Sequence, residues 1–159
     1  MNNIAEPNKL FRIKENGIFE EIKFEVALEP DGYGTGAAVA DIDNDGILEL
    51  IVSRGESKEQ PLTLYKAKVD KQSKYLRIKP INLFGAPARG ATVTLLTNQR
   101  KHSKTIDAGS GYLCQMEPVA HYGIRKNENN FKVEVKWTNG TKDSIKITSL
   151  NQTITIKQK

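Results

Sequence analysis

Short runs of alternating apolar and polar residues recur along the whole chain, and no long segment repeats its apolar residues with the period of a helix. Runs rich in Ile, Val, Thr and aromatic residues, separated by Gly, Asn and Asp, are typical of β-strands joined by turns. The clearest run covers residues 133–138 and is followed by Asn139, Gly140 and a second alternating run. An Asn-Gly pair favours the positive φ angles of a tight hairpin turn. The sequence therefore predicts an all-β protein with a hairpin at this turn.

The alternating runs also locate the other strands that we expect. The predicted strands are residues 8–14, 18–24, 36–41, 48–54, 62–68, 75–81, 91–97, 103–108, 112–116, 131–138, 143–148 and 153–157. A chain of 159 residues is long enough for one ordinary domain or two small ones, and it can bury a core.

The distribution of charge favours two domains. Residues 1–74 carry ten Lys and Arg against fourteen Asp and Glu, whereas residues 75–159 carry fourteen against five. A charged, weakly apolar segment at 67–74 lies where the balance changes sign. We therefore expect one domain at residues 1–66 and a second at residues 74–159.

The basic half raises the question of an anionic partner. Its lysines are spread along alternating runs and are not clustered, which is typical of the solvated faces of strands. Its aromatic residues are likewise scattered and do not form the platform on which nucleic-acid bases stack. Nucleic-acid binding is therefore not expected.

The chain has one cysteine, Cys114, which excludes an internal disulfide and a cysteine-based metal cluster. The first residues, MNNIAEPNKLF, lack the basic start and apolar run of a secretory signal peptide. No stretch is apolar enough to predict a membrane span.

One short segment has the spacing of a metal-binding loop. Residues 41–49, DIDNDGILE, place carboxylates at positions 1, 3, 5 and 9, with glycine at position 6. Calcium takes six to eight oxygen ligands, and glycine permits the sharp turn that directs alternate side chains to one centre. Converging carboxylates would repel one another without a cation. The expected Ca2+ ligands are Asp41, Asp43, Asp45, the backbone carbonyl of Ile47, and Glu49 either directly or through water.

Two other interpretations of this segment are an EF-hand and a plain solvated turn. An EF-hand requires an acidic residue at position 12, where this chain has Val52, and it requires flanking helices, where this sequence predicts strands. A plain solvated turn is the remaining alternative, because Asn, Asp and Gly are ordinary turn residues.

The sequence around this loop resembles the calcium-binding repeat of the FG-GAP and VCBS propeller families. The resemblance covers GAAVADIDNDG at residues 36–46 and LELIV at 48–52, and it extends to the flanking segments 8–12, 17–19 and 64–66. It implies that the first domain is one propeller-type blade of antiparallel strands. That family usually has aspartate at the ninth position, where this chain has Glu49.

The second half resembles the ASPIC and UnbV domain, through GATVTL at residues 90–95, AGSGYL at 108–113, PVAHYGI at 118–124 and VEVKWTNG at 133–140. In the cartilage acidic protein-like family such a domain follows a propeller of those repeats. The resemblance implies a β-sandwich-like domain in an extracellular or cell-surface protein with matrix or adhesion associations.

No nucleophile, base and orienting group can be assembled from recognisable motifs, and His121 is interpreted as a structural imidazole. We therefore expect a non-enzymatic calcium-binding interaction module that binds a glycan or a protein. The alternatives are an accessory fragment of a larger polysaccharide-active or biosynthetic enzyme, and a purely structural end-piece. Because a lone blade leaves edges and an apolar face uncovered, we also expect further blades in the full protein, or self-association through the blade.

Overall fold

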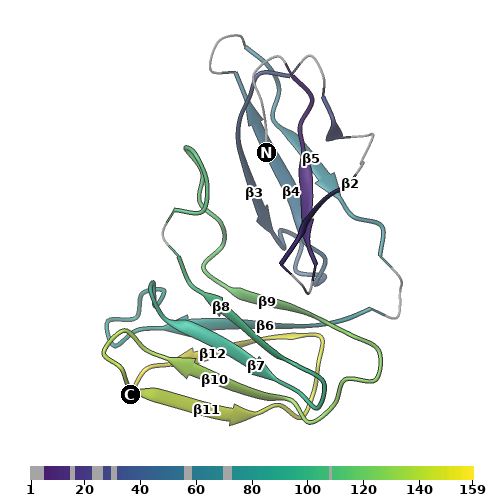
Figure 1. The fold of residues 1–159 in the computed structure, drawn as a ribbon. Coiled ribbons are helices and arrows are strands. Elements are labelled where there is room, and N and C mark those ends of the chain that lie inside the picture. Colours follow the sequence, from purple (N-terminus) through teal and green to yellow (C-terminus); the bar gives the residue numbers. More distant parts are fainter. Residues whose placement is uncertain are drawn as a thin grey trace. The chain divides into compact units, whose positions relative to one another are not determined.

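The chain folds entirely into strands and loops in a computed structural model that describes residues 6–14, 17–22, 27–29, 32–55, 59–69, 73–107 and 109–159 (Figure 1). No α-helix occurs among these described residues, so the predicted all-β class is confirmed. Nor do they include a helix that is long and apolar enough to cross a membrane.

The chain divides into two compact units. Unit 1 consists of Met1–Ile42, Leu48–Ala67 and Gly109–Met116, and unit 2 consists of Asp43–Ile47, Lys68–Ala108 and Glu117–Lys159. The division predicted from the sequence, at residues 1–66 and 74–159, stays a prediction.

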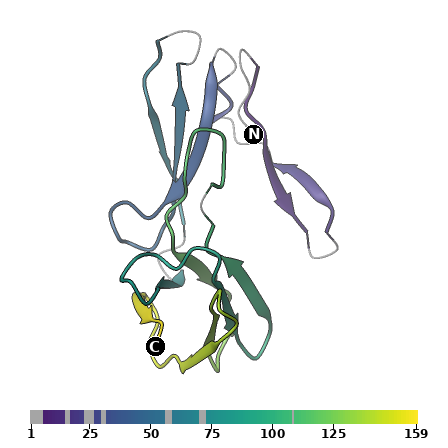
Figure 2. The ribbon, with the colours of Figure 1, turned by 90° about the vertical axis from the view of Figure 1, so that its left-hand side faces the viewer.

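Unit 1 contains a hairpin and a three-stranded sheet. β1 (Leu10–Ile13) and β2 (Phe19–Ile22), the purple arrows in Figure 2, pair with each other in a two-stranded sheet of the described residues. β3 (Gly34–Ala40), β4 (Glu49–Arg54) and β5 (Thr63–Lys66) form an antiparallel sheet in the order β3-β4-β5. All three of these strand pairs are antiparallel, as the sequence predicts.

A strand predicted at residues 112–116 does not form. The structure has an isolated bridge between Gly111 and Cys114 there, and Leu113 takes a left-handed φ of 51°. Such a φ belongs to turns and not to extended backbone. The thiol of Cys114 donates a hydrogen bond to the carbonyl of Ala37 on β3, at 3.1 Å, so the turn is attached to the sheet of unit 1.

Unit 2 is a β-sandwich-like domain of two sheets, arranged as β12-β6-β9 and β11-β10-β7-β8. The first sheet contains β6 (Lys74–Ile81), β9 (Ala120–Ile124) and β12 (Gln152–Lys157), and the second contains β7 (Thr92–Leu96), β8 (Lys101–Thr105), β10 (Lys132–Lys136) and β11 (Lys142–Lys146). All pairs are antiparallel except β12, which runs parallel to β6.

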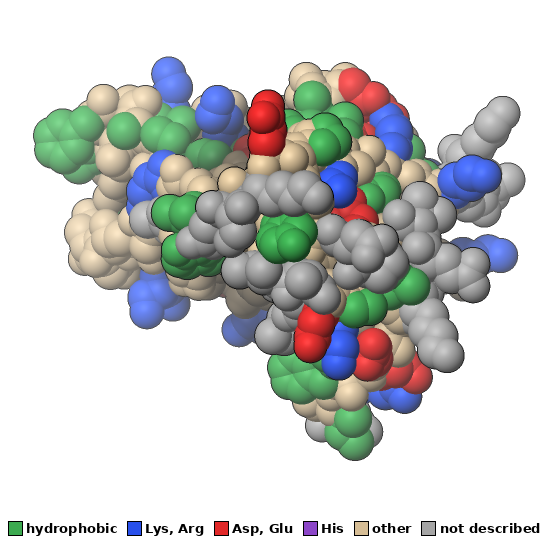
Figure 3. Space-filling view, turned by 90° about the horizontal axis from the view of Figure 1, so that it is seen from above, with side chains coloured by type: hydrophobic (Ala, Val, Ile, Leu, Met, Phe, Trp, Pro, Cys, Tyr) green, Lys and Arg blue, Asp and Glu red, His purple; other side chains and the backbone are tan. Residues whose placement is uncertain are grey.

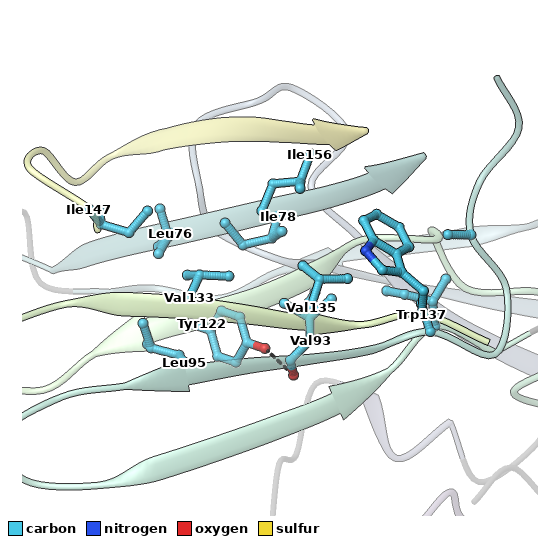
Figure 4. Packing of buried hydrophobic residues seen from close by; sticks show 14 residues of the cluster. Leu76, Ile78, Val93, Leu95, Tyr122, Val133, Val135, Trp137, Ile147 and Ile156 are labelled. Carbon is cyan, nitrogen blue, oxygen red and sulfur yellow. Dashed lines mark hydrogen bonds between the residues drawn. The ribbon is translucent and has the colours of Figure 1, made fainter. Parts of the chain in front are cut away.

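Apolar side chains from both sheets fill the core of unit 2 (Figure 4). Alternate residues of β7 and β10 point inward, because successive side chains of a strand leave on opposite faces. Tyr122 of β9 lies fully buried among them, and its hydroxyl donates a 2.8 Å hydrogen bond to the carbonyl of Val93. Burial also raises the pKa of this tyrosine. The largest fully buried members are Leu76, Ile78, Val93, Leu95, Tyr122, Val133 and Val135.

The predicted hairpin forms between β10 and β11, with Lys136 opposite Lys142. Its turn differs in detail from the predicted one. Gly140 has a φ of 86°, whereas Asn139 is not among the residues with positive φ, and the amide of Trp137 bonds to the carbonyl of Thr141. This is the wider connection, in which one left-handed glycine closes the turn as a bulge.

Candidate metal site

The candidate site is built by the hairpin of β3 and β4. Ala40 and Glu49 are the last paired residues of these strands, so residues 41–48 form the connecting loop. Because paired strands hold opposite residues about 5 Å apart, the register brings the two ends of the loop together. Asp41 and Glu49 are both buried there, with only 4% and 3% of their surface exposed.

Three carboxylates converge in this loop. Oxygen atoms of Asp41, Asp43 and Glu49 all lie within 4.8 Å of one another. Two oxygens that bind one calcium ion at about 2.3 to 2.6 Å lie no more than about 5 Å apart, so these oxygens are close enough to share an ion. The donor set also suits calcium, which prefers hard oxygen ligands.

The loop curls through hydrogen bonds from its backbone amides to its own aspartate side chains. The amide of Asp45 donates to Asp43 Oδ1 at 3.3 Å, and the amide of Ile47 donates to Asp45 Oδ1 at 2.9 Å. Asn44 and Gly46 take left-handed φ angles of 61° and 84°, which Asn and Gly tolerate better than other residues. Asp45 is outside the group of three carboxylates, so the ligand roles of Asp45 and of the Ile47 carbonyl stay predictions.

The Glu49 carboxylate is held from two sides. Its Oε2 accepts a 2.9 Å hydrogen bond from the amide of Ile42, and its Oε1 lies 3.2 Å from the ammonium of Lys66. Lys66 is opposite Glu49 in the register of β4 and β5, and its side chain is 40% exposed. A cation bound between the carboxylates would therefore have a competing positive charge next to one of its ligands.

The tip of the loop is fixed by residues of β6. Asn44 Oδ1 accepts a 3.1 Å hydrogen bond from Nη1 of Arg77, whose side chain is almost fully buried. Nη2 of Arg77 also pairs with Glu117. Gly46 lies against the ring of Tyr75, where a Cβ atom would come within 2.0 Å of the ring carbons. Residue spacing along the loop does not predict these neighbours, since Lys66 reaches Glu49 through the pairing of β5 with β4, and Arg77 and Tyr75 belong to β6.

The histidines have other surroundings. His121 of β9 stacks on the ring of Tyr75, with ring centroids 6.1 Å apart and planes at 5°. Burial lowers the pKa of His102, and the neighbouring Arg100 and Lys104 lower it further.

The second half of the chain is similar to a known protein family. Residues 85–159 match the family model described as ASPIC and UnbV. This carboxyl-terminal segment is similar to that family, as its motifs predicted. The ASPIC and UnbV segment covers β7 to β12, and therefore most of the sandwich-like unit.

The chain is also similar to cartilage acidic protein 1. It is 48% identical to the protein of Homo sapiens, over 87% of this chain and 22% of that relative. The protein of Xenopus tropicalis is 48% identical and that of Mus musculus 47% identical, with 23% of each relative covered. The chain thus spans about a fifth of the length of the curated relatives that it matches. The resemblance of residues 36–52 to the FG-GAP and VCBS repeat stays a prediction.

Proposed function

We propose that this chain is a non-enzymatic interaction module of an extracellular or cell-surface protein, that it binds Ca2+ at the loop of residues 41–49, and that it recognises a glycan or a protein. The observation that carries the calcium part is the convergence of Asp41, Asp43 and Glu49 at the end of the β3–β4 hairpin. The similarity to cartilage acidic protein 1 supports the extracellular part.

The proposed role of the ion is architectural. Asp41, Asp43 and Glu49 would hold it, with Asp45 and the Ile47 carbonyl completing the oxygen shell. The ion supplies positive charge where the buried carboxylates of Asp41 and Glu49 come together, and so it relieves their repulsion. It also joins both ends of the loop, which stabilises the pairing of β3 with β4.

The first prediction is that calcium raises the melting temperature. A ligand that binds only the folded state adds about 2.7 kcal/mol at a hundredfold excess over its dissociation constant. Magnesium is expected to act far less, because its small octahedral shell suits a flexible carboxylate loop poorly. Asp43→Asn is expected to remove the calcium response. Calorimetry on the same samples measures the binding heat.

Glu21→Gln is the matched control, because it removes one negative charge from an exposed position of β2, outside the loop. It is expected to keep the calcium response. Melting curves that coincide in excess calcium and in chelator, together with no heat of binding, would contradict the calcium site.

The absence of catalysis is proposed because the acidic cluster is explained by an ion and His121 by its stacking on Tyr75. A screen for hydrolase and lyase activity is therefore expected to be negative. Reproducible turnover that His121→Ala abolishes would overturn this part of the proposal.

A further inference from the structure

Unit 2 contains a groove whose residues are distant in sequence from the acidic loop. An open groove of about 740 Å³ lies among residues 73–74 at the start of β6, residues 124–131 and residues 150–151. These segments meet because Lys74 of β6 is opposite Ile124 at the end of β9, and because β12, which follows residues 150–151, pairs with β6.

The apolar part of the groove is formed by Ile124, Phe131 and Leu150. All three are partly buried and pack against the core of unit 2, so their positions are fixed by the sandwich. An aromatic ring with aliphatic neighbours offers a flat apolar surface. Sugar rings present faces of C–H groups that match such a surface.

The rim of the groove is cationic. Lys74, Arg125 and Lys126 are exposed lining residues. Glu128, an acidic residue that lines the groove, already has partners within the chain. Its carboxylate pairs with the guanidinium of Arg100 and accepts a 2.8 Å hydrogen bond from the Arg125 amide. Burial alone would raise the pKa of Glu128, but these contacts outweigh it and the pKa lies below its usual value. Glu128 is the one acid among the described residues that line the groove, so Lys74, Arg125 and Lys126 give this lining a net positive charge.

Hydrogen bonds fix the backbone on both sides of the groove. The turn of residues 125–128 is closed by the amide of Glu128, which donates to the Arg125 carbonyl at 3.2 Å. On the other side, the amide of Asn151 donates to the Tyr75 carbonyl at 2.8 Å, and Asn151 Oδ1 accepts from the Tyr75 amide at 3.1 Å. A preformed groove loses little conformational entropy when a ligand binds.

We propose that this groove binds an acidic oligosaccharide. Sulfate or carboxylate groups of the sugar contact Lys74, Arg125 and Lys126, and a sugar ring lies on Phe131. The guanidinium of Arg125 presents parallel donors that match either anion. The amides of Asn127 and Asn151, which also line the groove, supply hydrogen bonds to hydroxyl groups. The inference rests on the proposed function, because it names the ligand of the proposed interaction module.

Single-stranded nucleic acid is the less favoured ligand for this groove. Its sequence-independent binding sites stack successive bases on several aromatic rings. Phe131 is the sole aromatic residue among the described residues that line this groove. One ring fits one sugar unit better than it fits a series of bases.

The test is calorimetry of the whole chain with four probes: a heparin octasaccharide, a hyaluronan octasaccharide, neutral maltooctaose and a single-stranded oligothymidylate. Binding of heparin or hyaluronan is expected, and the hyaluronan arm shows whether carboxylates suffice without sulfate. Maltooctaose is expected to bind at least about tenfold more weakly than the tighter acidic sugar, because it lacks charge for the rim. No binding of either acidic sugar, or tighter binding of the oligothymidylate than of both, overturns the proposal.

Two variants test the residues. Arg125→Ala with Lys126→Ala is expected to weaken the acidic sugar at least about tenfold. Lys136→Ala with Lys142→Ala is the matched control, because it removes the same charge from exposed residues of the β10–β11 hairpin. If both double variants lose the same amount of affinity for the acidic sugar, binding depends on the overall positive charge of the chain, and the groove proposal is overturned. Phe131→Leu keeps the charge and is expected to weaken binding several-fold, and unchanged affinity would contradict the stacking surface.

The calcium response of the melting temperature separates this proposal from the proposed metal site. The variant Arg125→Ala with Lys126→Ala lies outside residues 41–49 and is expected to keep that response in full. Acidic sugar binding that persists in chelator supports the groove independently of the ion. If the unchanged chain binds neither acidic sugar while calcium still stabilises it, the groove is contradicted and the metal site is left standing.

Discussion

At the scale of single residues, the neighbours of Glu49 are expected to set the calcium affinity of the proposed ion site. The ammonium of Lys66 lies 3.2 Å from Glu49 Oε1 and would therefore lie beside the proposed ion. Removing this charge with Lys66→Met is expected to raise calcium affinity at least several-fold, since two unit charges about 4 Å apart interact by about 1 kcal/mol even in bulk water and by more near a protein surface. Calorimetry at low salt measures the change.

The control for Lys66→Met is Lys79→Met, which removes an exposed lysine from β6. It changes the net charge by the same amount and is expected to leave the affinity nearly unchanged. If both variants raise affinity equally, the effect belongs to the net charge of the chain and not to the contact with Glu49.

Gly46 is the residue of the loop with the least freedom to change. Its φ of 84° is left-handed, and a Cβ atom would come within 2.0 Å of the Tyr75 ring. Gly46→Ala is expected to lower the free energy of unfolding by about 1 to 3 kcal/mol, because both the backbone and the ring must shift. Gly123→Ala, where nothing lies within 4 Å of the added atom, is the control for urea denaturation. Equal stability of the two variants would contradict this packing.

At the scale of strands, alternation predicted eleven of the twelve described strands, with most ends differing by one to three residues. β9 (Ala120–Ile124) was missed because its sequence, AHYGI, has no β-branched residue before its last position and includes a glycine. The strand predicted at 112–116 was wrong because the residues there resemble a strand in composition but form a turn.

In the candidate site, residues close together in the sequence could be predicted, whereas residues brought in from other strands could not. Asp41, Asp43 and Glu49 could be predicted because a short loop and a strand pairing bring them together. Lys66 and Arg77 could not, because their positions depend on how β5 pairs with β4 and on what approaches the loop tip. Residue spacing along one segment contains neither of these facts.

The turn of residues 125–128 is held by a charged contact, and this makes unit 2 sensitive to acid. The Glu128 carboxylate pairs with Arg100, and its pKa is lowered because the Arg125 amide and Arg100 outweigh the effect of burial. A lowered folded pKa means that this stability is full above the usual glutamate pKa and is lost as pH falls from there through the folded value.

We expect Glu128→Gln to cost about 1 to 3 kcal/mol at neutral pH, because it removes the carboxylate from Arg100. The difference from the unchanged chain is expected to shrink as the pH falls below the usual glutamate value. Urea denaturation at neutral pH and at about pH 3 measures it. A difference that stays constant with pH would contradict the role assigned to the ionised carboxylate.

At the scale of the whole molecule, unit 1 leaves large apolar side chains in solvent. Figure 3 shows hydrophobic side chains at several places on one face of the molecule, among charged ones. The hairpin of β1 and β2 holds several of them, and two-stranded hairpins are marginally stable by themselves. The exposed large apolar residues of the hairpin and its turn are Leu10, Phe11, Ile13, Ile18 and Phe19.

Ile13 and Phe19 form the most exposed apolar pair of this hairpin. They are opposite each other in the β1–β2 register, and they are 65% and 66% exposed. Paired apolar side chains on a sheet that has two open edges favour contact with another chain or a further sheet. We therefore expect the chain to self-associate at high concentration in sedimentation equilibrium, and we expect Ile13→Ser with Phe19→Ser to weaken that association.

Phe84→Ser is the control for this double variant. It removes a side chain that is 92% exposed in unit 2, and it is expected to leave association unchanged. A strict monomer at high concentration would show that the apolar pair of the hairpin has no partner in a second copy of the chain.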